Sequence, residues 1–308
     1  MSEAAPTNTP PPIGEQLRYI GRDIKLSHTV FALPFALLAT FLAADWGRRL
    51  PGWDEFVLIL LCMFFARTSA MTVNRWLDAS FDTSNPRTSG RAVPSGRVPA
   101  RTMGLTAIGS ALLLVVGAGG FWVFRDNPWP LLLSPVVLAV LCGYSLTKRF
   151  TWLCHAVLGL ALALSPLAAT IAIEPGYLGS PVVWLLGLMV LCWVAGFDVI
   201  YALQDVEHDR AEGLHSMPSR LGVGRAMWIS RASHLVAAGC LVGMVMTSEQ
   251  LGVVFAAGVA LTIGLLLLEH ALVWGSRTHQ LNTAFFTVNG VISLLLGAGG
   301  LADILLAS

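Results

Sequence analysis

Long apolar stretches separated by short polar segments run through the chain from about residue 27 to its C-terminus. A helix that crosses a bilayer needs roughly 20 mostly apolar residues. Nine stretches meet this requirement: residues 27–45, 54–77, 103–124, 130–146, 152–173, 181–203, 226–247, 250–273 and 282–305. Proline or glycine occurs in the breaks at 125–128 and 174–176, as expected where helices end. The pattern predicts an all-α integral membrane protein with nine transmembrane helices.

The composition agrees with a membrane protein rather than a soluble domain. Of the 308 residues, 55% are hydrophobic and 12% are charged, whereas soluble domains carry about 25% charged residues. Residues 1–14 are polar and rich in proline, which predicts a disordered cytoplasmic tail. Residues 15–308 are then expected to form a single transmembrane domain in contact with the lipid bilayer. No nucleic-acid partner is expected.

The five cysteines indicate neither a disulfide framework nor a zinc site. They lie within or beside apolar stretches, and no two form a CxxC pair: Cys62, Cys142, Cys154, Cys192 and Cys240. Cysteines in such surroundings usually behave as small hydrophobic residues. We therefore expect these side chains to pack without forming bonds to one another.

Positive charges are distributed unevenly between the two sides of the predicted bundle. Lys and Arg concentrate in short cytoplasmic loops, and a cytoplasmic N-terminus places 15 of the 19 on that side, from Arg18 to Arg277. Three lie on the outer side (Arg48, Arg49 and Arg125), and Arg67 lies within a helix. The asymmetry supports nine spans. It predicts a multi-pass protein of the cell inner (plasma) membrane with its N-terminus in the cytoplasm.

Two groups of acidic residues stand at the ends of apolar stretches with matching spacing. They comprise one amide and five carboxylates: Asn74, Asp78, Asp82, Asp198, Asp205 and Asp209. Asp78 and Asp205 are 127 positions apart, as are Asp82 and Asp209, which hints at an ancient duplication. Carboxylates beside a bilayer are costly and usually functional. Because Mg²⁺ typically joins a few carboxylates to substrate phosphates, two such clusters facing one cavity predict a magnesium and diphosphate site.

The first cluster continues a helical face that begins at Arg67. Positions 67, 71, 74, 78 and 82 follow helical spacing, so we expect them to share one face. Arg67 then lies about 10 Å deeper than Asn74, at roughly 1.5 Å per residue. A guanidinium at this depth either pairs with another helix or holds an anion, and its planar fork suits a carboxylate. We predict that Arg67 binds an anionic substrate.

Basic and polar residues accompany both clusters on the same side. Arg87 and Arg91 follow the first cluster in a turn-rich loop, where they fit either solvated loop charge or a clamp on a diphosphate. Lys148, at the end of the fourth stretch, has the same two interpretations. In the second cluster, Tyr201 is expected on the same helix face as the aspartates. Substrate contacts are predicted for Arg67, Arg87, Arg91, Tyr144, Ser145, Lys148 and Tyr201.

These motifs together resemble the UbiA superfamily of intramembrane prenyltransferases over nearly the whole apolar length. The resemblance rests on Asn74-x3-Asp78-x3-Asp82 with Arg87-Thr88 and Arg91-x2-Pro94-Ser95-Gly96, and on Asp198-x2-Tyr201-Ala202-x2-Asp205-x3-Asp209. Residues 27–34 and 214–218 make the chain look most like the 4-hydroxybenzoate polyprenyltransferases and related enzymes of menaquinone synthesis. Arg75 departs from the pattern, since many members have Asp after the Asn of the motif.

The resemblance implies a ring of nine helices around a central cavity, with Mg²⁺ as the cofactor. Asn74, Asp78 and Asp82 would bind one Mg²⁺–diphosphate unit, and Asp198, Asp205 and Asp209 would bind the other. The substrates would be a polyprenyl diphosphate, with its tail in an apolar groove open to lipid, and an aromatic carboxylic acid that faces Arg67. The implied catalytic residues are Asp78, Asp198, Asp205 and Arg67.

The implied reaction transfers the polyprenyl group to the ring carbon ortho to the hydroxyl of 4-hydroxybenzoate, in ubiquinone biosynthesis. A dihydroxynaphthoate of a menaquinone pathway is an alternative acceptor, because it keeps the carboxylate that suits Arg67. A cation-coupled secondary transporter is an alternative of another class, although transporters usually place acidic groups near the bilayer midplane. A purely structural membrane protein would leave the aligned aspartates unexplained.

Overall fold

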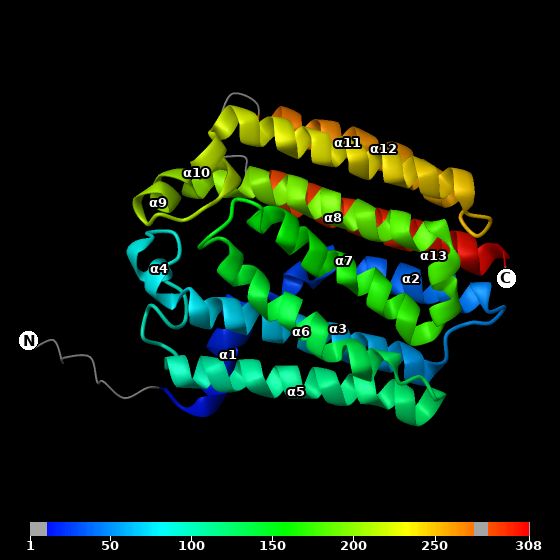
Figure 1. Ribbon diagram of the computed structural model, residues 1–308, viewed down its shortest axis with the longest axis horizontal. Coiled ribbons are helices and arrows are strands. Elements are labelled where there is room, and N and C mark those ends of the chain that lie inside the picture. Colours follow the sequence, from blue (N-terminus) through cyan, green and yellow to red (C-terminus); the bar gives the residue numbers. More distant parts are fainter. Residues whose placement is uncertain (1–10, 274–282, 308) are drawn as a thin grey trace, which may run out of the picture.

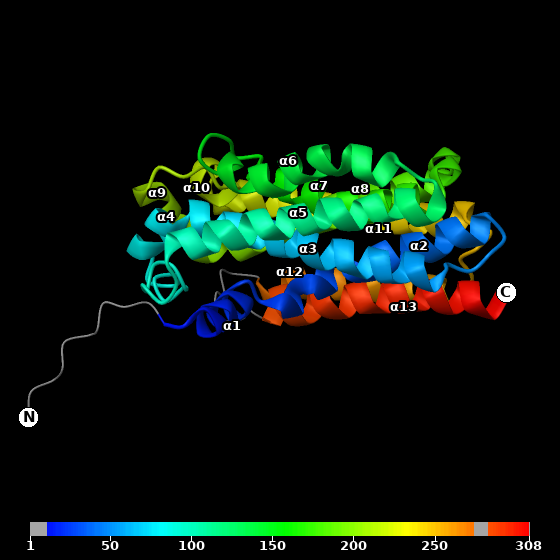
Figure 2. The same ribbon diagram turned by 90° about the horizontal axis from the view of Figure 1, so that it is seen from below.

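The computed structural model describes residues 11–273 and 283–307. Within these ranges, nine helical segments are long and apolar enough to cross a membrane, which confirms the predicted number. Their helices are α2 (Leu33–Trp46), α3 (Trp53–Leu77), α5 (Ala100–Arg125), α6 (Trp129–Thr147), α7 (Cys154–Ile173), α8 (Pro181–Tyr201), α11 (Val223–Thr247), α12 (Val253–Leu272) and α13 (Asn289–Ala307). They lie side by side along the long axis of the molecule (Figures 1 and 2).

One end of the bundle carries most of the short elements, and we call it the polar end. It is defined by α4 (Ala79–Ser84), α9 (Val206–Ala211) and α10 (Met217–Leu221) (Figure 1). The last helix, α13, ends at the opposite end (Figure 2). The Lys and Arg residues predicted to be cytoplasmic lie in segments at the polar end, except Arg277, which is outside the described residues.

An additional short helix precedes the first span. α1 (Ile13–Asp23) begins inside the predicted tail of residues 1–14, of which residues 1–10 lie outside the described part of the chain. Gln16 and Ile20, one helical turn apart, are buried on its inner side. Ile20 belongs to a small apolar cluster with Val98, which precedes α5, and Met103, in the first turn of α5. α1 therefore packs against the segment that connects α4 to α5.

The core of the bundle is centred on α8, the most buried of the spanning helices in the described chain. α8 packs between α7 and α11, and Trp193 makes edge-on contacts with Phe31, Phe35 and Phe197. Gly159 of α7 approaches so closely that an added Cβ would overlap the carbonyl oxygen of Leu191. This packing fixes the height of α7 against α8, and hence the relative position of the residues at their polar ends.

α6 and the outer faces of α5 and α12 expose large apolar side chains instead. Leu132 and Val136 of α6, Val116 of α5 and Leu267 of α12 are each more than half exposed. Such faces suit contact with hydrocarbon, because every backbone polar group inside a helix is already paired. The remaining short elements are η1 (Leu26–Phe31), η2 (Pro175–Gly179), η3 (Ala202–Asp205) and the π-helical η5 (Thr283–Val288).

Candidate active site

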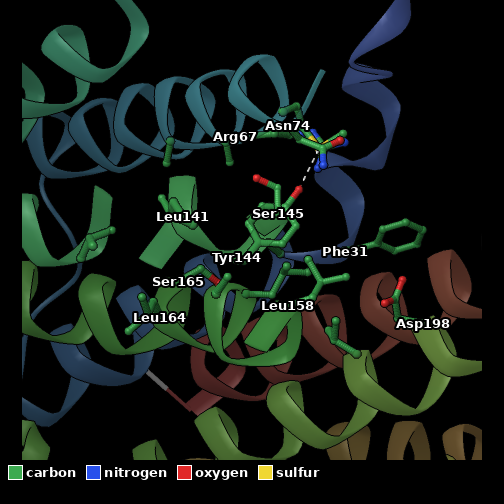
Figure 3. Close-up of a pocket in the computed structure, with 18 of the residues that line it drawn as sticks. Phe31, Arg67, Asn74, Leu141, Tyr144, Ser145, Leu158, Leu164, Ser165 and Asp198 are labelled. Atoms are coloured by element: carbon green, nitrogen blue, oxygen red, sulfur yellow. Dashed lines mark hydrogen bonds between the residues drawn. The ribbon is translucent and has the colours of Figure 1, made fainter. Parts of the chain in front are cut away.

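A single cavity of about 930 Å³ contains every side chain that the sequence assigns to the site. These residues all line it: Arg67, Asn74, Asp78, Asp82, Arg87, Arg91, Tyr144, Ser145, Lys148, Asp198, Tyr201, Asp205 and Asp209. Figure 3 shows Arg67 and Asn74 from α3, Tyr144 and Ser145 from α6 and Asp198 from α8 around it. The two acidic clusters therefore face one space, as the sequence predicts, while the roles of the individual residues remain predictions.

The first cluster does not lie on one continuous helix, although positions 67, 71, 74, 78 and 82 all line the cavity, as the prediction of a shared face requires. α3 ends at Leu77, and Asp78 adopts φ −92° and ψ 3°, outside the helical range of ψ. α4 begins at Ala79 and carries Asp82. The backbone N–H of Asp82 still donates to the Asp78 carbonyl oxygen at 2.8 Å. The break lets Asp82 become buried near the cavity without extending α3 farther into water.

The second cluster is broken in the same way. Asp198 and Tyr201 belong to the last turn of α8, Asp205 ends the short 3₁₀ helix η3, and Asp209 belongs to α9. The predicted single face through Asp209 is therefore divided among three elements. In both halves of the chain, a spanning helix ends near its acidic motif and a one- or two-turn helix places the last aspartate.

The loop after the first cluster reaches across to the second. Arg87 forms a bidentate ion pair with Asp205, with Nε–Oδ1 at 3.0 Å and Nη2–Oδ2 at 2.6 Å. The side-chain amide of Asn85 donates to the same carboxylate at 3.3 Å. The guanidinium of Arg87 also lies over the ring of Tyr201, 5.6 Å from its centroid. This contact ties together two stretches that are 118 positions apart.

The other cavity aspartates also have a basic partner. Arg91 contacts both carboxylate oxygens of Asp82 at 2.7 Å, and Lys148 contacts Asp209 at 2.7 Å. Two further pairs were not predicted from the sequence: Arg149 lies 3.2 Å from Asp78, and His155 lies 2.7 Å from Asp198. Pairing of this kind lowers the cost of placing carboxylates beside a membrane.

Charge and burial act together on the groups outside the membrane spans. Burial opposes the positive charge of Lys148, but the Asp209 carboxylate outweighs it and raises the pKa of the Lys148 ammonium. The same balance, with Asp205 as the partner, raises the pKa of Arg87. Burial also raises the pKa of the Asp78 carboxyl, although Arg149 opposes the shift. The basic groups therefore stay charged next to the acidic cluster.

Arg75, the departure from the family motif, lies inside the first cluster. Its Nη1 donates to the Asn74 amide oxygen at 2.5 Å, and its Nε lies 3.7 Å from an Asp23 carboxylate oxygen. The amide of Asn74 in turn donates to Asp78 at 2.7 Å. The Asp23 carboxylate also accepts from the backbone N–H of Ala92 at 3.0 Å. Arg75 thus links α3 to α1, and the Asn74 oxygen that could bind a metal accepts a hydrogen bond.

Arg67 lies on the wall of the cavity formed by α3, as predicted. Its Nη2 donates to the carbonyl oxygens of Ile24 and Lys25, at 3.3 and 3.1 Å. These carbonyls belong to the connection between α1 and η1. The Nε of Arg67 is buried and has no hydrogen-bond partner in the described structure. Arg67 is therefore attached to the backbone at the end of α1 as well as facing the cavity.

His155 and Arg149 are cavity residues whose contacts the sequence did not reveal. His155, near the start of α7, bonds to Asp198 through Nδ1 and accepts the Met217 backbone N–H at Nε2, 3.2 Å away. Arg149 also donates to the Leu77 carbonyl oxygen at 2.7 Å, which caps the end of α3. The basic pair of residues 148–149 was a visible signal for Arg149. No local pattern indicated His155, because its partner is 43 positions away.

The donor set fits a hard divalent cation such as Mg²⁺. The Asp209 carboxylate is fully buried, and its Oδ2 has no hydrogen-bond partner in the described structure. Among the described residues, no three His, Cys, Asp or Glu side chains form a metal cage by themselves. Mg²⁺ usually completes its octahedron with water and substrate phosphate, so a few scattered carboxylate oxygens are the expected arrangement.

Away from the polar end, the cavity becomes apolar. Its walls there include Leu133 and Val137 of α6 and Leu164 of α7. Along α7, the lining extends from His155 to Ala172, which is about 26 Å at roughly 1.5 Å per residue. The cavity therefore combines a charged head at the end of the bundle with a long apolar body inside it.

An integral membrane protein with an acidic and basic site at the head of an apolar cavity is suited to an amphiphilic phosphorylated lipid. Known proteins that are similar to this chain belong to a family of membrane enzymes. The model of the UbiA prenyltransferase family matches residues 32–291. The chain belongs to the UbiA prenyltransferase family.

Two bacterial proteins named 4-hydroxybenzoate octaprenyltransferase are similar to this chain in sequence. The chain is 35% identical over 182 residues to the 4-hydroxybenzoate octaprenyltransferase of Photobacterium profundum, a match that spans 58% of this chain and 59% of that protein. It is 30% identical over 277 residues to the enzyme of the same name from Saccharophagus degradans, which covers 88% of this chain and 87% of that one.

Solved structures of two archaeal homologues have the same architecture. The ligand-free UbiA homologue of Aeropyrum pernix K1 is 30% identical and superposes with a TM-score of 0.80, over 91% of this chain and 99% of that one. The UbiA homologue of Archaeoglobus fulgidus, bound to DMAPP and Mg²⁺, superposes with a TM-score of 0.69 at 20% identity, over 94% and 98%. The second likeness concerns the fold alone.

Proposed function

We propose that the protein transfers a polyprenyl group from polyprenyl diphosphate to a ring carbon of an aromatic acid, 4-hydroxybenzoate, in ubiquinone biosynthesis. The observation that carries the proposal is the convergence of both acidic clusters and their basic partners at the head of one cavity with a long apolar body. The names of the similar bacterial proteins supply the acceptor. The charged head suits a diphosphate, and the apolar body suits its prenyl tail.

The six residues of the two clusters would hold Mg²⁺: Asn74, Asp78, Asp82, Asp198, Asp205 and Asp209. When bound, Mg²⁺ would supply Lewis-acid stabilisation of the departing diphosphate. The chain itself adds fixed positive charge around the same leaving group, from Arg87, Arg91 and Lys148. Fixed charges that need no rearrangement are effective at stabilising charge that develops in a transition state.

The chemistry proceeds by breaking the bond between the allylic carbon and the diphosphate oxygen, which leaves an allylic cation and inorganic diphosphate. The ring carbon ortho to the acceptor hydroxyl then forms the new carbon–carbon bond. The same ring carbon loses a proton, for which the Asp198 carboxylate, held by His155, is a suitable acceptor. The apolar walls exclude water, which would otherwise capture the cation.

We further propose that the polar end faces the cytoplasm and that the membrane is the inner (plasma) membrane. Lys and Arg residues that the sequence places inside the cell lie at this end. Water-soluble aromatic acids and Mg²⁺ are available there. A cytoplasmic opening for the charged head is therefore consistent with the substrates proposed.

The test is an assay of the purified full-length chain in lipid nanodiscs with geranyl diphosphate, Mg²⁺ and 4-hydroxybenzoate. We expect geranylated 4-hydroxybenzoate by mass spectrometry and one inorganic diphosphate released per product. The variant Asp78→Ala is expected to give neither, while still eluting as a folded protein. Product with 1,4-dihydroxy-2-naphthoate alone would replace the acceptor. Absence of diphosphate release with either acid, together with ion-driven solute flux, would replace the enzyme by a transporter.

A further inference from the structure

α1 carries an apolar stripe that the rest of the described chain covers over only part of its length. The members of the stripe recur at intervals of four and three positions, which places them on one side of the helix: Ile13, Leu17, Ile20 and Ile24. Ile20 and Ile24 are buried in the small apolar cluster beside α5. Ile13 and Leu17 are 63% and 51% exposed. The stripe therefore extends beyond the protein surface on which its second half packs.

Two exposed tryptophans, Trp53 and Trp76, mark the membrane boundaries near the two ends of α3. The 23 positions between them correspond to about 35 Å at roughly 1.5 Å per residue, and the hydrocarbon core of a bilayer is about 30 Å thick. The Trp76 ring lies against Gly104, where an added Cβ would be 3.4 Å from it. Gly104 follows Met103, which belongs to the same apolar cluster as Ile20. α1 therefore packs at the level of the interfacial tryptophan, at the polar end of the bundle (Figure 2).

Four exposed arginines accompany α1, and we call them the arginine patch: Arg18, Arg22, Arg97 and Arg101. In the described part of the chain, none of the four forms an ion pair with a carboxylate. The Arg97 guanidinium lies over the Tyr19 ring, 5.6 Å from its centroid, which connects the patch to α1. Of the two acids of α1, Glu15 contacts Tyr19 and Asp23 lies beside Arg75. The patch is therefore available for an external anion.

We propose that α1 is an interfacial helix that docks on an anionic phospholipid surface. Ile13 and Leu17 enter the boundary between headgroups and acyl chains, and the arginine patch binds lipid phosphates. Helices that lie in a membrane interface combine an apolar side with Lys and Arg on the polar side. Each basic residue beside an anionic surface strengthens binding about fivefold. A soluble phosphate would satisfy the charges alone, whereas a bilayer surface also covers the exposed half of the stripe.

The docked helix is attached to the site through its last residue. Asp23 ends α1, accepts the backbone N–H of Ala92 at 3.0 Å and lies 3.7 Å from Nε of Arg75. Arg75 in turn donates to Asn74 of the first cluster. Lipid that holds α1 therefore also holds a carboxylate that contacts the edge of the site. The inference goes beyond the proposed prenyl transfer, because the lipid is a structural partner of the chain and not its substrate.

The first experiment compares two sides of α1 by labelling with a water-soluble maleimide. The full-length variants Leu17→Cys and Glu15→Cys are placed in nanodiscs of phosphatidylcholine and phosphatidylglycerol, and peptide mass spectrometry assigns the label to the introduced cysteine. The protein leaves both positions exposed, so only lipid can distinguish them. We expect Leu17→Cys to react at least about tenfold more slowly, because the apolar side of an interfacial helix is buried in the membrane. Equal rates would overturn the proposal.

The second experiment measures amide hydrogen exchange of residues 13–23 in nanodiscs with and without phosphatidylglycerol. We expect the anionic lipid to slow exchange in the parent chain at least about tenfold, the scale of two arginines beside an anionic surface. The slowing should be lost in Arg18→Gln/Arg22→Gln. It should persist in Arg210→Gln/Arg225→Gln, a matched control that removes two exposed charges from α9 and α11, across the bundle from α1 (Figure 1). Slowing that persists in Arg18→Gln/Arg22→Gln would overturn the proposal.

A soluble anion separates lipid from free phosphate as the partner. Glycerol phosphate added to nanodiscs of pure phosphatidylcholine should leave the exchange of residues 13–23 unchanged, and slowing equal to that by phosphatidylglycerol would overturn the assignment to a lipid surface. All substituted positions are exposed, so the variants should keep the thermal midpoint of the parent chain. Neither experiment measures catalysis. A parent chain that transfers no prenyl group would therefore refute the proposed function without altering either result.

Discussion

Asp205 is the residue at which the two halves of the site meet, because it accepts hydrogen bonds from both Arg87 and Asn85. We expect Asp205→Asn to reduce turnover at least about 100-fold, the scale seen when one preorganised electrostatic group is removed. The assay is geranyl transfer in nanodiscs. Glu207→Gln, an exposed acid two residues farther on, is the matched control and should retain activity.

A binding measurement distinguishes loss of chemistry from loss of structure in the same variant. Mg²⁺ with inorganic diphosphate should raise the thermal midpoint of the parent chain, because a ligand that binds only the folded state stabilises it. The shift should be absent in Asp205→Asn and present in Glu207→Gln. A normal shift in Asp205→Asn would remove this carboxylate from the metal and diphosphate site.

At the residue scale, the sequence identified the cavity residues well but not their partners. Asp78 and Asp205 could be predicted because costly carboxylates at matching positions are visible in the chain itself. His155 could not, because its contact with Asp198 exists only after α7 packs against α8. Arg75 was recognised as unusual, but its bridge from Asn74 to Asp23 depends on where α1 folds back.

At the scale of elements, the nine spans were predictable because their length and apolar composition are imposed by the bilayer. The ends of the spans were less so. Helical periodicity extends through Asp82 and Asp209 in the sequence, but the backbone breaks at Asp78 and again before Asp209. The spacing of polar residues in the sequence predicts which side chains share a helix face, but it does not show where the helix axis changes direction. The separate short helices α4, η3 and α9 were therefore not predicted.

The close approach of α7 to α8 gives a prediction at this scale. Gly159→Ala should place a methyl group against the Leu191 carbonyl oxygen and force the helices apart. We expect a loss of about 1–3 kcal/mol of stability, as for overpacked cores, seen as a lower thermal midpoint in detergent. Gly239→Ala, in α11 with no atom near the added Cβ, should not lower the midpoint. Equal midpoints for the two variants would contradict this account of the packing.

At the scale of the whole molecule, the described chain passes from the polar end, where α1 and η1 lie, to the opposite end, where α13 finishes. An odd number of spans and the distribution of Lys and Arg predict termini on opposite sides of the membrane. A fluorescent protein at the N-terminus should be bright, and alkaline phosphatase at the C-terminus should be active. Reporters that place both termini on one side would refute the orientation.

The pairing of cavity aspartates with basic side chains also bears on how the chain is inserted during synthesis. Arg87 is synthesised 118 positions before Asp205. Its ion pair with Asp205 therefore cannot form until four more spans have been made. Carrying such a charge through hydrocarbon would cost about 3 kcal/mol. With the polar end on the cytoplasmic side, as proposed above, neither group has to be translocated, and the helices can be inserted before the ion pair between Arg87 and Asp205 forms.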